Sequence, residues 1–376
     1  MRTCAQVTGW GKCLPRQILT NDDLAKRIDT SDEWIRSRTG IAARRIADAR
    51  ESTATLAIRA ARNALAVSGL PPQKLELIIV ATITPEHIFP ATACLVQDAL
   101  GASRAGAFDL SAGCSGFVYA LSLAAQAIES GRHRNALVIG SETLSRIVDW
   151  NDRNTCVLFG DGAGAVILEA AEGHGGFRSC VLGADGSGAN LLIMPAGGSR
   201  HPANPTSFHN GEHFIRMDGR EVYRFASRII VRATREVVEA AGLTLNDVSL
   251  LIPHQANIRI IESAARELGL KEDRVYVNIQ RYGNTSSASV PIALCEAVEE
   301  GRLHPGDRIV LVGFGAGLTW AAALLRWGVP TPVPPVPAWR RVGSSAGYGL
   351  ARARSLLMRL VRKVDTVLFA PRRNGK

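Results

Sequence analysis

The chain has 376 residues, 46% of them apolar, and a formal net charge of +10. This apolar content excludes an intrinsically disordered main body, and there is no apolar run long enough for a membrane-spanning helix. The segment 331–376 alone contains ten Lys or Arg and one acidic residue, so the rest of the chain is close to neutral and nucleic-acid binding is not indicated for it.

Seven cysteines are scattered along the chain, and none of them forms a CxxC pair. An odd, unpaired set argues against a disulfide framework and a structural zinc site, and it indicates a reducing, cytoplasmic compartment. The N-terminal segment Met1–Pro15 lacks the basic and apolar regions of a signal peptide, so a first β-strand is predicted there.

Short apolar segments alternate with helical patterns through most of the chain. This alternation predicts an α/β sandwich with mainly buried sheets. Strands are predicted at Leu77–Thr82, Ala105–Leu110, Ala136–Gly140, Leu250–Pro253, Val275–Ile279 and Arg308–Gly313. Helices are predicted at Ser52–Ser68, Phe117–Ser130, Glu221–Ala241, Ile258–Leu268 and Val290–Glu300.

Two stretches share one pattern, in which a helix end is followed by a Gly-Arg turn and a buried strand. These stretches are 129–140 and 299–313, and the segments upstream of them, 75–85 and 248–256, also correspond. The pattern indicates a duplicated α/β half whose two copies fold into one pseudo-symmetric unit. The alternative is that helix–glycine–strand joints look alike in any α/β protein.

A candidate nucleophile follows the predicted strand Ala105–Leu110. The sequence Ser111-Ala-Gly-Cys-Ser-Gly-Phe117 places Cys114 in a turn of small residues at a helix N-terminus, where the dipole and free N–H groups favour a thiolate. The small neighbours leave room for a substrate. The alternative is a buried structural cysteine in a tight joint.

Two more polar side chains are candidates for the same site, because one directly follows a strand and the other lies in a turn. His254 follows the strand Leu250–Pro253, and Asn284 lies in the turn Tyr282–Ser286 before a helix. Together with Cys114 they can form a nucleophile and two hydrogen-bond donors to a developing oxyanion. Taken singly, His254 is more often structural and the turn is more often a helix cap.

Six motifs occur in a fixed order: Thr30–Ile41, Ser111–Phe117, Phe159–Ala165, Pro253–Arg259, Gly283–Ser287 and Phe314–Trp320. With them the chain resembles the β-ketoacyl-[acyl-carrier-protein] synthase III family from about Thr8 to Trp327. The resemblance implies a thiolase-like, five-layered αβαβα sandwich made of two pseudo-symmetric halves. Their expected bounds are 1–171, which carries the candidate nucleophile, and 172–328, which carries the other two candidate residues.

The resemblance also implies a reaction. Cys114 would take an acyl group from acyl-CoA, and malonyl-acyl carrier protein would be decarboxylated and condensed with it, which initiates fatty-acid synthesis. His254 and Asn284 would stabilise the enolate, and the backbone N–H groups of Cys114 and Ala316 would hold the thioester oxyanion. Acyl-CoA is a substrate here, so neither a cofactor nor a metal is implied.

Further contacts are implied by position in the family motifs. Trp34 and Arg153 match the pair that sandwiches the adenine of CoA, and Arg38 and Asn257 match further CoA contacts.

Other matching positions concern partner proteins. Arg224, Arg259 and Arg266 fall where the family docks its acidic carrier protein, although basic residues on helices are usually only solvated. Phe89 matches a loop that reaches into the acyl pocket of the partner subunit, which implies a homodimer.

The composition changes after Trp327. A Pro-rich linker is expected over 329–345 and a basic amphipathic tail over 346–376. One helical face of the tail collects Leu350, Ala353, Leu357, Leu360, Val361, Val364 and Leu368. Broadly on the other face lie Arg352, Arg359, Arg362 and Lys363. Three interpretations stay open: a disordered extension, peripheral contact with an anionic membrane surface, and contact with an acidic partner.

Two alternative functions are also carried forward. One is a related polyketide-type enzyme that condenses or transfers longer acyl groups. The other belongs to a different class, a membrane- or partner-binding protein with a vestigial core, against which the intact set of Cys114, His254 and Asn284 argues.

Overall fold

The computed structural model describes residues 3–173, 175–329 and 348–361. Its first sheet is mixed and five-stranded, in the order β1-β7-β6-β4-β5. β4 pairs in parallel with β5 and β6, whereas β7 is antiparallel to both β6 and β1. These strands are β1 (Thr3–Cys13), β4 (Leu77–Ala81), β5 (Gly106–Leu110), β6 (Asn135–Thr143) and β7 (Asp161–Glu172).

The second sheet has four strands in the order β11-β12-β13-β8. Only β11 and β12 run parallel to each other in it, and β13 is antiparallel to both of its neighbours. The strands are β8 (Gly176–Ala184), β11 (Leu250–Pro253), β12 (Arg308–Gly315) and β13 (Thr319–Arg326).

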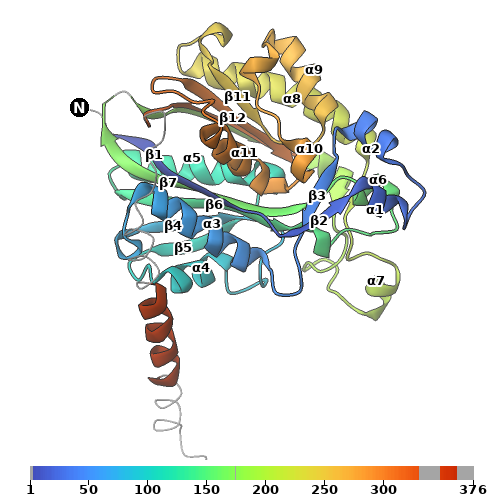
Figure 1. Ribbon diagram of the computed structural model, residues 1–376, viewed down its shortest axis with the longest axis horizontal. Coiled ribbons are helices and arrows are strands. Elements are labelled where there is room, and N and C mark those ends of the chain that lie inside the picture. The colour runs from blue at the N-terminus through green and yellow to red at the C-terminus, as the bar shows by residue number, and fades with distance from the viewer. Residues whose placement is uncertain (1–2, 174, 330–347, 362–376) are drawn as a thin grey trace, which may run out of the picture.

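Six longer helices complete five layers around these sheets (Figure 1). α3 (Thr53–Ser68) and α4 (Thr92–Leu100) cover the outer face of the first sheet. α5 (Gly116–Glu129) and α11 (Ser289–Glu299) lie between the sheets. α8 (Gly219–Ala240) and α9 (Ile258–Leu268) cover the second sheet from outside. The predicted αβαβα sandwich is confirmed.

The central helices are apolar on nearly every side, which is why they fit between two sheets. Glycines in the first sheet let α11 approach closely. A Cβ on Gly140 would lie 2.3 Å from the carbonyl oxygen of Ser287, and one on Gly164 would lie 2.7 Å from the backbone nitrogen of Ile292. The glycine-rich motif Phe159–Ala165 therefore belongs largely to β7, where it makes room for the helix.

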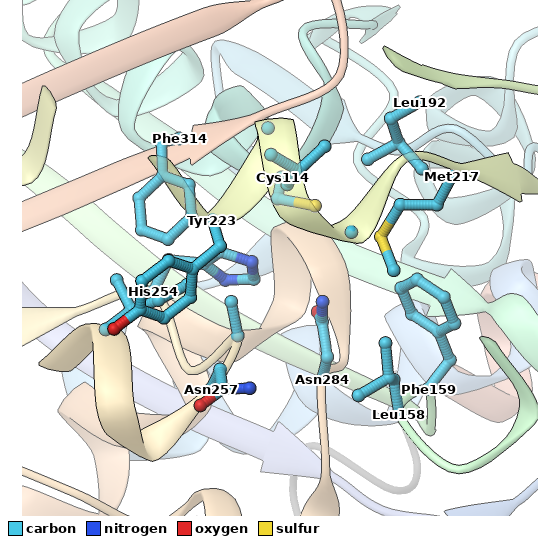
Figure 2. Close-up of a pocket in the computed structure, with 15 residues that line it drawn as sticks. Cys114, Leu158, Phe159, Leu192, Met217, Tyr223, His254, Asn257, Asn284 and Phe314 are labelled. Atoms are coloured by element: carbon cyan, nitrogen blue, oxygen red, sulfur yellow. The ribbon is translucent and has the colours of Figure 1, made fainter. Parts of the chain in front are cut away.

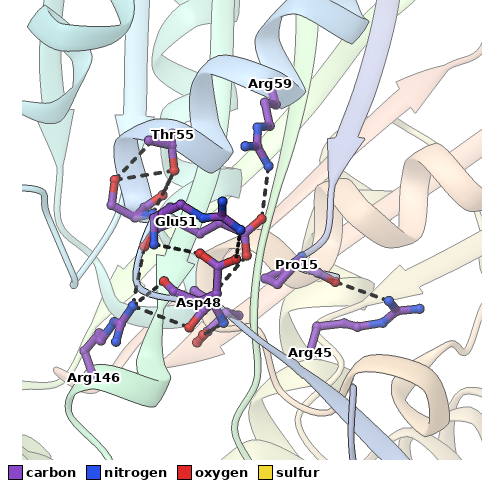
Figure 3. Close-up of polar contacts among 11 residues, drawn as sticks. Pro15, Arg45, Asp48, Glu51, Thr55, Arg59 and Arg146 are labelled. Atoms are coloured by element: carbon purple, nitrogen blue, oxygen red, sulfur yellow. Dashed lines mark hydrogen bonds and ion pairs between the residues drawn. The ribbon is translucent and has the colours of Figure 1, made fainter. Parts of the chain in front are cut away.

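An excursion between β1 and α3 brings α2 to the edge of the body. A polar network fixes the segment that leads from this excursion into α3 (Figure 3). Arg146 donates to the carbonyl of Asp48 at 2.7 Å, and Arg59 donates to the carboxylate of Glu51 at 3.0 Å. The excursion contains β2 (Gln17–Thr20), α1 (Asn21–Ala25), α2 (Asp32–Thr39) and β3 (Ala43–Ile46). The remaining short elements are α6 (Arg153–Cys156), β9 (Leu192–Ile193), α7 (Pro205–His209), β10 (Arg216–Met217) and α10 (Ile279–Tyr282).

The predicted strands and helices are confirmed within a few residues, with one exception. Val275–Ile279 was predicted as a strand, but only Val275 forms a bridge, to Leu251, and Ile279 begins α10. The amide oxygen of Gln255 accepts from the backbone N–H groups of Asn278 and Ile279. These donors are therefore satisfied by a side chain, and a β-ladder is not needed for them.

Residues 348–361 form a further helix, so the tail is described over that range only. Of the predicted linker only Val329 is described, and Val364 and Leu368 of the predicted apolar face lie outside the described residues. Within the described part of the chain, no helix combines the length and the apolar character that crossing a membrane requires.

Candidate active site

Cys114 lies in a short 3-10 turn, η2 (Gly113–Ser115), between β5 and α5, as the sequence predicts. Gly113 has a φ of 55°, and a Cβ there would lie 2.8 Å from the backbone nitrogen of Ala316. A Cβ on Gly315 would lie 2.5 Å from the backbone nitrogen of Cys114 and 3.1 Å from its Sγ. Glycine is thus required on both sides of the thiol because two segments of backbone meet there.

The thiol is almost completely enclosed, with Cys114 only 5% exposed. Burial raises the pKa of Cys114 to about 12, although the neighbouring Ser286 side chain acts against this shift. The sequence predicts a thiolate favoured by the helix dipole, but the protonated thiol is the stable form in the enclosed site. The start of α5 therefore has to assist when the thiolate forms during reaction.

His254 follows β11 directly and is also buried. Burial lowers the pKa of His254 to about 3, so its imidazole is neutral at physiological pH. Its Nδ1 lies 2.5 Å from the hydroxyl oxygen of Ser289, and that oxygen accepts from the backbone N–H of Gln255. In the tautomer in which Nδ1 accepts the Ser289 hydroxyl proton, Nε2 is the protonated donor.

Asn284 lies in the turn before α11, and its amide is oriented by its own neighbours. Its Oδ1 accepts from the backbone N–H of Ser286 at 2.8 Å, so the NH2 group is free to face the pocket. Figure 2 shows the Asn284 amide and the His254 imidazole arranged around the Cys114 sulfur. The three predicted residues therefore converge on one cavity, with a thiol beside two uncharged polar side chains.

A buried carboxylate that the sequence analysis missed lies behind these residues. Glu142, at the end of β6, accepts from the hydroxyls of Thr84 at 2.6 Å, Ser287 at 2.8 Å and Ser286 at 3.1 Å. Burial raises the pKa of Glu142, and these hydrogen bonds oppose that shift. Ser286 is held by this carboxylate with a φ of 51°, which is unusual for a residue other than glycine. A charged residue directly after an apolar strand was the available sequence signal.

Two cavities meet at Cys114. One of them is lined by His254 and Asn284 and continues past Tyr223 to Asn257. The other is predominantly apolar and is lined by Ile83, Leu144, Ile147, Ile215 and Ala316, among others. Two pockets thus share the thiol as their common wall, and the polar side chains His254, Asn284 and Asn257 all line the first of them.

Ala316, the other residue of the predicted oxyanion site, lies beside Gly113 and lines the same cavity as Cys114. Among the described non-glycine residues only Ser286 has a positive φ, so Ala316 is accommodated without backbone strain. An alanine therefore fits this position without a glycine's conformational freedom.

The structure brings together three of the residues predicted to contact CoA. The guanidinium carbons of Arg38 and Arg153 lie 4.8 and 4.9 Å from the ring centroid of Trp34, at the surface end of α2. Arg153 is additionally held by the carbonyl of Asp29 at 2.9 Å. Because Arg153 already lies against Trp34, an adenine can enter between them only if the guanidinium moves.

Asn257 is the fourth predicted CoA contact and the N-cap of α9. Its side chain accepts from the backbone N–H of Arg259 and donates to the carbonyl of Arg38 at 3.1 Å. It lines the cavity of His254 and Asn284 at the same time. Asn257 therefore joins α9 to α2 at the mouth of the site.

The predicted partner contacts are all at the surface. Arg224 forms an ion pair with Glu221 at 2.7 Å, and Arg259 donates to the carbonyl of Ser37 at 3.0 Å, whereas Arg266 is exposed on α9. Phe89 is 84% exposed on the loop between β4 and α4, so the site of its own chain does not bury it.

Comparison with known proteins places these features in a family. Residues 108–192 match the family described as 3-Oxoacyl-[acyl-carrier-protein (ACP)] synthase III, and residues 238–327 match its C-terminal part. A β-ketoacyl-[acyl-carrier-protein] synthase III of Symbiobacterium thermophilum is 55% identical over 322 residues, which cover 86% of this chain and 98% of the relative.

Solved structures agree with the sequence relatives. The 3-oxoacyl-[acyl-carrier-protein] synthase III of Aquifex aeolicus VF5 superposes with a TM-score of 0.80 at 49% identity, over 86% of this chain and 100% of that one. The priming β-ketosynthase of the R1128 polyketide pathway gives a TM-score of 0.81 at 39% identity, over 88% and 98% of the two chains.

Proposed function

The chain belongs to the β-ketoacyl-[acyl-carrier-protein] synthase III family, and on that premise we propose a role for each residue of its buried site. The protein is an acyltransferase that performs the initiating condensation of fatty-acid synthesis. One observation carries the residue assignment: Cys114, His254 and Asn284 come from three separate segments and line one cavity. Neither alternative function is favoured, since the curated relatives at about half identity are β-ketoacyl-[acyl-carrier-protein] synthases III.

In the first step Cys114 attacks the thioester carbonyl of an acyl-CoA. The sulfur–carbon bond to Cys114 forms, the bond to CoA breaks, and the thiol proton ends on the departing CoA sulfur. The backbone N–H groups of Cys114 and Ala316 hold the oxyanion of the tetrahedral intermediate. Because burial disfavours the thiolate, nucleophile and oxyanion must be stabilised together in this step.

In the second step malonyl-acyl carrier protein enters the same cavity. Loss of CO2 leaves an enolate, whose oxygen accepts hydrogen bonds from Nε2–H of His254 and from the amide of Asn284. The enolate carbon attacks the acyl thioester, a carbon–carbon bond forms, and the Cys114 sulfur leaves and takes up a proton. The product is a 3-oxoacyl-acyl carrier protein, and no cofactor takes part.

The two cavities divide the substrate between them. The cavity lined by Leu144 and Ile147 receives the acyl chain, and the one lined by His254 and Asn284, which ends at Asn257, receives the pantetheine arm. Trp34, Arg38 and Arg153 at its mouth bind the adenine end of CoA. Arg224, Arg259 and Arg266 offer exposed positive charge to the acidic carrier protein.

The functional unit that we propose is a homodimer. β5 is an edge strand of the first sheet, and its Phe108 is 42% exposed. The neighbouring loop exposes Ile88 and Phe89. An uncovered edge with apolar side chains invites pairing with a second copy, in which Phe89 would close the partner's acyl pocket. We also assign 1–171 and 172–328 as the two halves of each subunit.

Intact-protein mass spectrometry with a panel of acyl-CoAs tests the nucleophile. We expect one acyl adduct on the wild-type chain and none on Cys114→Ala, and the preferred chain length reports the size of the apolar cavity. An adduct that persists in Cys114→Ala would refute the assignment.

A further inference from the structure

The helix 348–361 extends away from the body beside α4 (Figure 1). The body holds one side of it. The guanidinium carbon of Arg62 lies 4.4 Å from the ring centroid of Tyr348, and the carboxylate of Asp98 accepts from Ser355 at 2.7 Å and from Arg359 at 3.5 Å. Spacings of seven and four residues place these three tail residues on one face of a helix.

The opposite face of the same helix is aliphatic and exposed. Leu350, Leu357 and Leu360 are 73%, 61% and 60% exposed, and Val361 is 43% exposed. A surface helix ordinarily turns its apolar face to the core and its polar face to water. Here the polar face is held by α3 and α4, so the apolar face is directed outward, where a binding surface is its usual explanation.

The charge of the segment limits what can cover this face. Residues 331–376 carry ten Lys or Arg against one acidic residue, and Arg354 is exposed beside the aliphatic face. A second copy of the helix would bring the same positive charge. With Leu356 and Met358 the helix exposes six large apolar side chains, still far fewer than the roughly 20–30 residues per side of a stable protein interface of about 800 Å² per partner. The occupant should therefore be anionic and apolar at once.

We propose that the outward face of helix 348–361 binds the surface of an anionic lipid bilayer. The leucines insert at the boundary between headgroups and acyl chains, and the arginines lie among anionic headgroups. Through Asp98 and Arg62 the helix holds the condensing body beside the membrane. This inference concerns a surface distant from the catalytic cavity, and it goes beyond the condensation reaction.

Vesicle flotation of the full chain tests the proposal, with phosphatidylcholine vesicles that contain or lack phosphatidylglycerol. At about 0.1 M salt we expect at least roughly tenfold more protein on the anionic vesicles. Leu357→Gln with Leu360→Gln should lower that binding about tenfold or more, because it removes the buried aliphatic area. The matched control, Leu357→Met with Leu360→Met, should bind like the wild type.

Condensation on soluble substrates should be equal in all of these variants, so loss of vesicle binding cannot be confused with loss of the active site. The proposal is overturned if the folded wild-type chain ignores anionic vesicles, or if the double Gln variant floats unchanged. It is also overturned if sedimentation velocity shows that the leucines instead govern self-association or binding of the acidic carrier protein.

Discussion

The two central helices occupy corresponding places but present different chemistry. α5 and α11 both lie between the sheets, and each begins after a 3-10 turn, η2 (Gly113–Ser115) or η7 (Ser286–Ala288). Their starts meet, since a Cβ on Gly116 would lie 3.8 Å from that of Ser287. α5 begins with a nucleophile, whereas α11 begins with hydroxyls that orient other groups.

This difference shows how two similar helix starts can share one reaction. At α5 the dipole and free N–H groups favour the charge that develops on Cys114. At α11 the hydroxyl of Ser289 orients His254, and those of Ser286 and Ser287 donate to Glu142. The α5 side should therefore govern acyl transfer, and the α11 side should govern decarboxylation and condensation.

Cys114→Ala should have the largest effect on activity. It should also distinguish the role of the α5 start from that of the α11 start most clearly. Condensation should fall by at least roughly 10⁴-fold because the covalent intermediate is lost. Decarboxylation of malonyl-acyl carrier protein should persist, since both enolate donors are unchanged. Measurement of CO2 release beside product formation checks this division, and loss of both activities in a folded variant would contradict it.

Asn284→Ala should show the opposite pattern, with condensation slowed and acylation of Cys114 retained. Removal of one oxyanion donor should slow condensation by about 10²–10³-fold. Acylation of Cys114 by acyl-CoA, followed by intact mass, should proceed at the wild-type rate. His254→Ala should behave in the same way. If either variant slowed acylation as much as condensation, the assignment of separate roles to the two helix starts would be wrong.

The neutrality of His254 should appear in the pH dependence of stability. The pKa of His254 is lowered to about 3 by burial, so between pH 6.5 and 3 the unfolded chain binds a proton that the folded chain does not. With respect to His254, the free energy of unfolding is highest above pH 6.5 and decreases as the pH falls below it. The free energy of unfolding of His254→Asn, measured with denaturant, should depend less steeply on pH than that of the wild type. The difference in slope should be up to about 1.4 kcal/mol per pH unit. Parallel curves for variant and wild type would refute a neutral, buried His254.

Ser289→Ala should have the smallest effect, since Ser289 positions His254 and touches no substrate. Loss of one buried hydrogen bond costs about 1–1.5 kcal/mol, so condensation should slow roughly tenfold. Acylation should be unaffected, and Ser289→Thr should restore the rate. Ser122→Ala is the matched control, because Ser122 of α5 bonds only within its own helix, to the carbonyl of Val118 at 2.8 Å. An equal loss in both variants would indicate a general packing defect.

Much of the architecture could be predicted from the periodicity of apolar residues and from the glycines and turn residues that bound each element. Apolar runs bounded by glycine predicted the central strands, and Cys114, His254 and Asn284 follow strands or turns whose direction is local. The prediction of a strand at Val275–Ile279 was wrong because the backbone of this segment bonds to the side chain of Gln255, which lies about twenty residues away in the chain. Such a long-range hydrogen bond has no local pattern.

The protonation state of the site could not be predicted from sequence for a related reason. The turn before α5 indicates a thiolate, but the enclosure of Cys114 comes from Gly315 and the distant β12. Glu142 was missed because its five donor residues come from two separate segments. A residue that a strand or turn points into a site can be recognised from the local sequence. The burial that shifts its pKa depends on distant segments and exists only in the folded chain.

The enclosed thiol also has a consequence for oxidative damage. Peroxides react with thiolates at accessible positions, so a protonated and 5% exposed Cys114 is a poor target. Cys94, exposed on α4, is open to solvent instead. The nucleophile can thus remain reduced between turnovers without a resolving cysteine, and its reactivity is released only towards a thioester that fills the pocket.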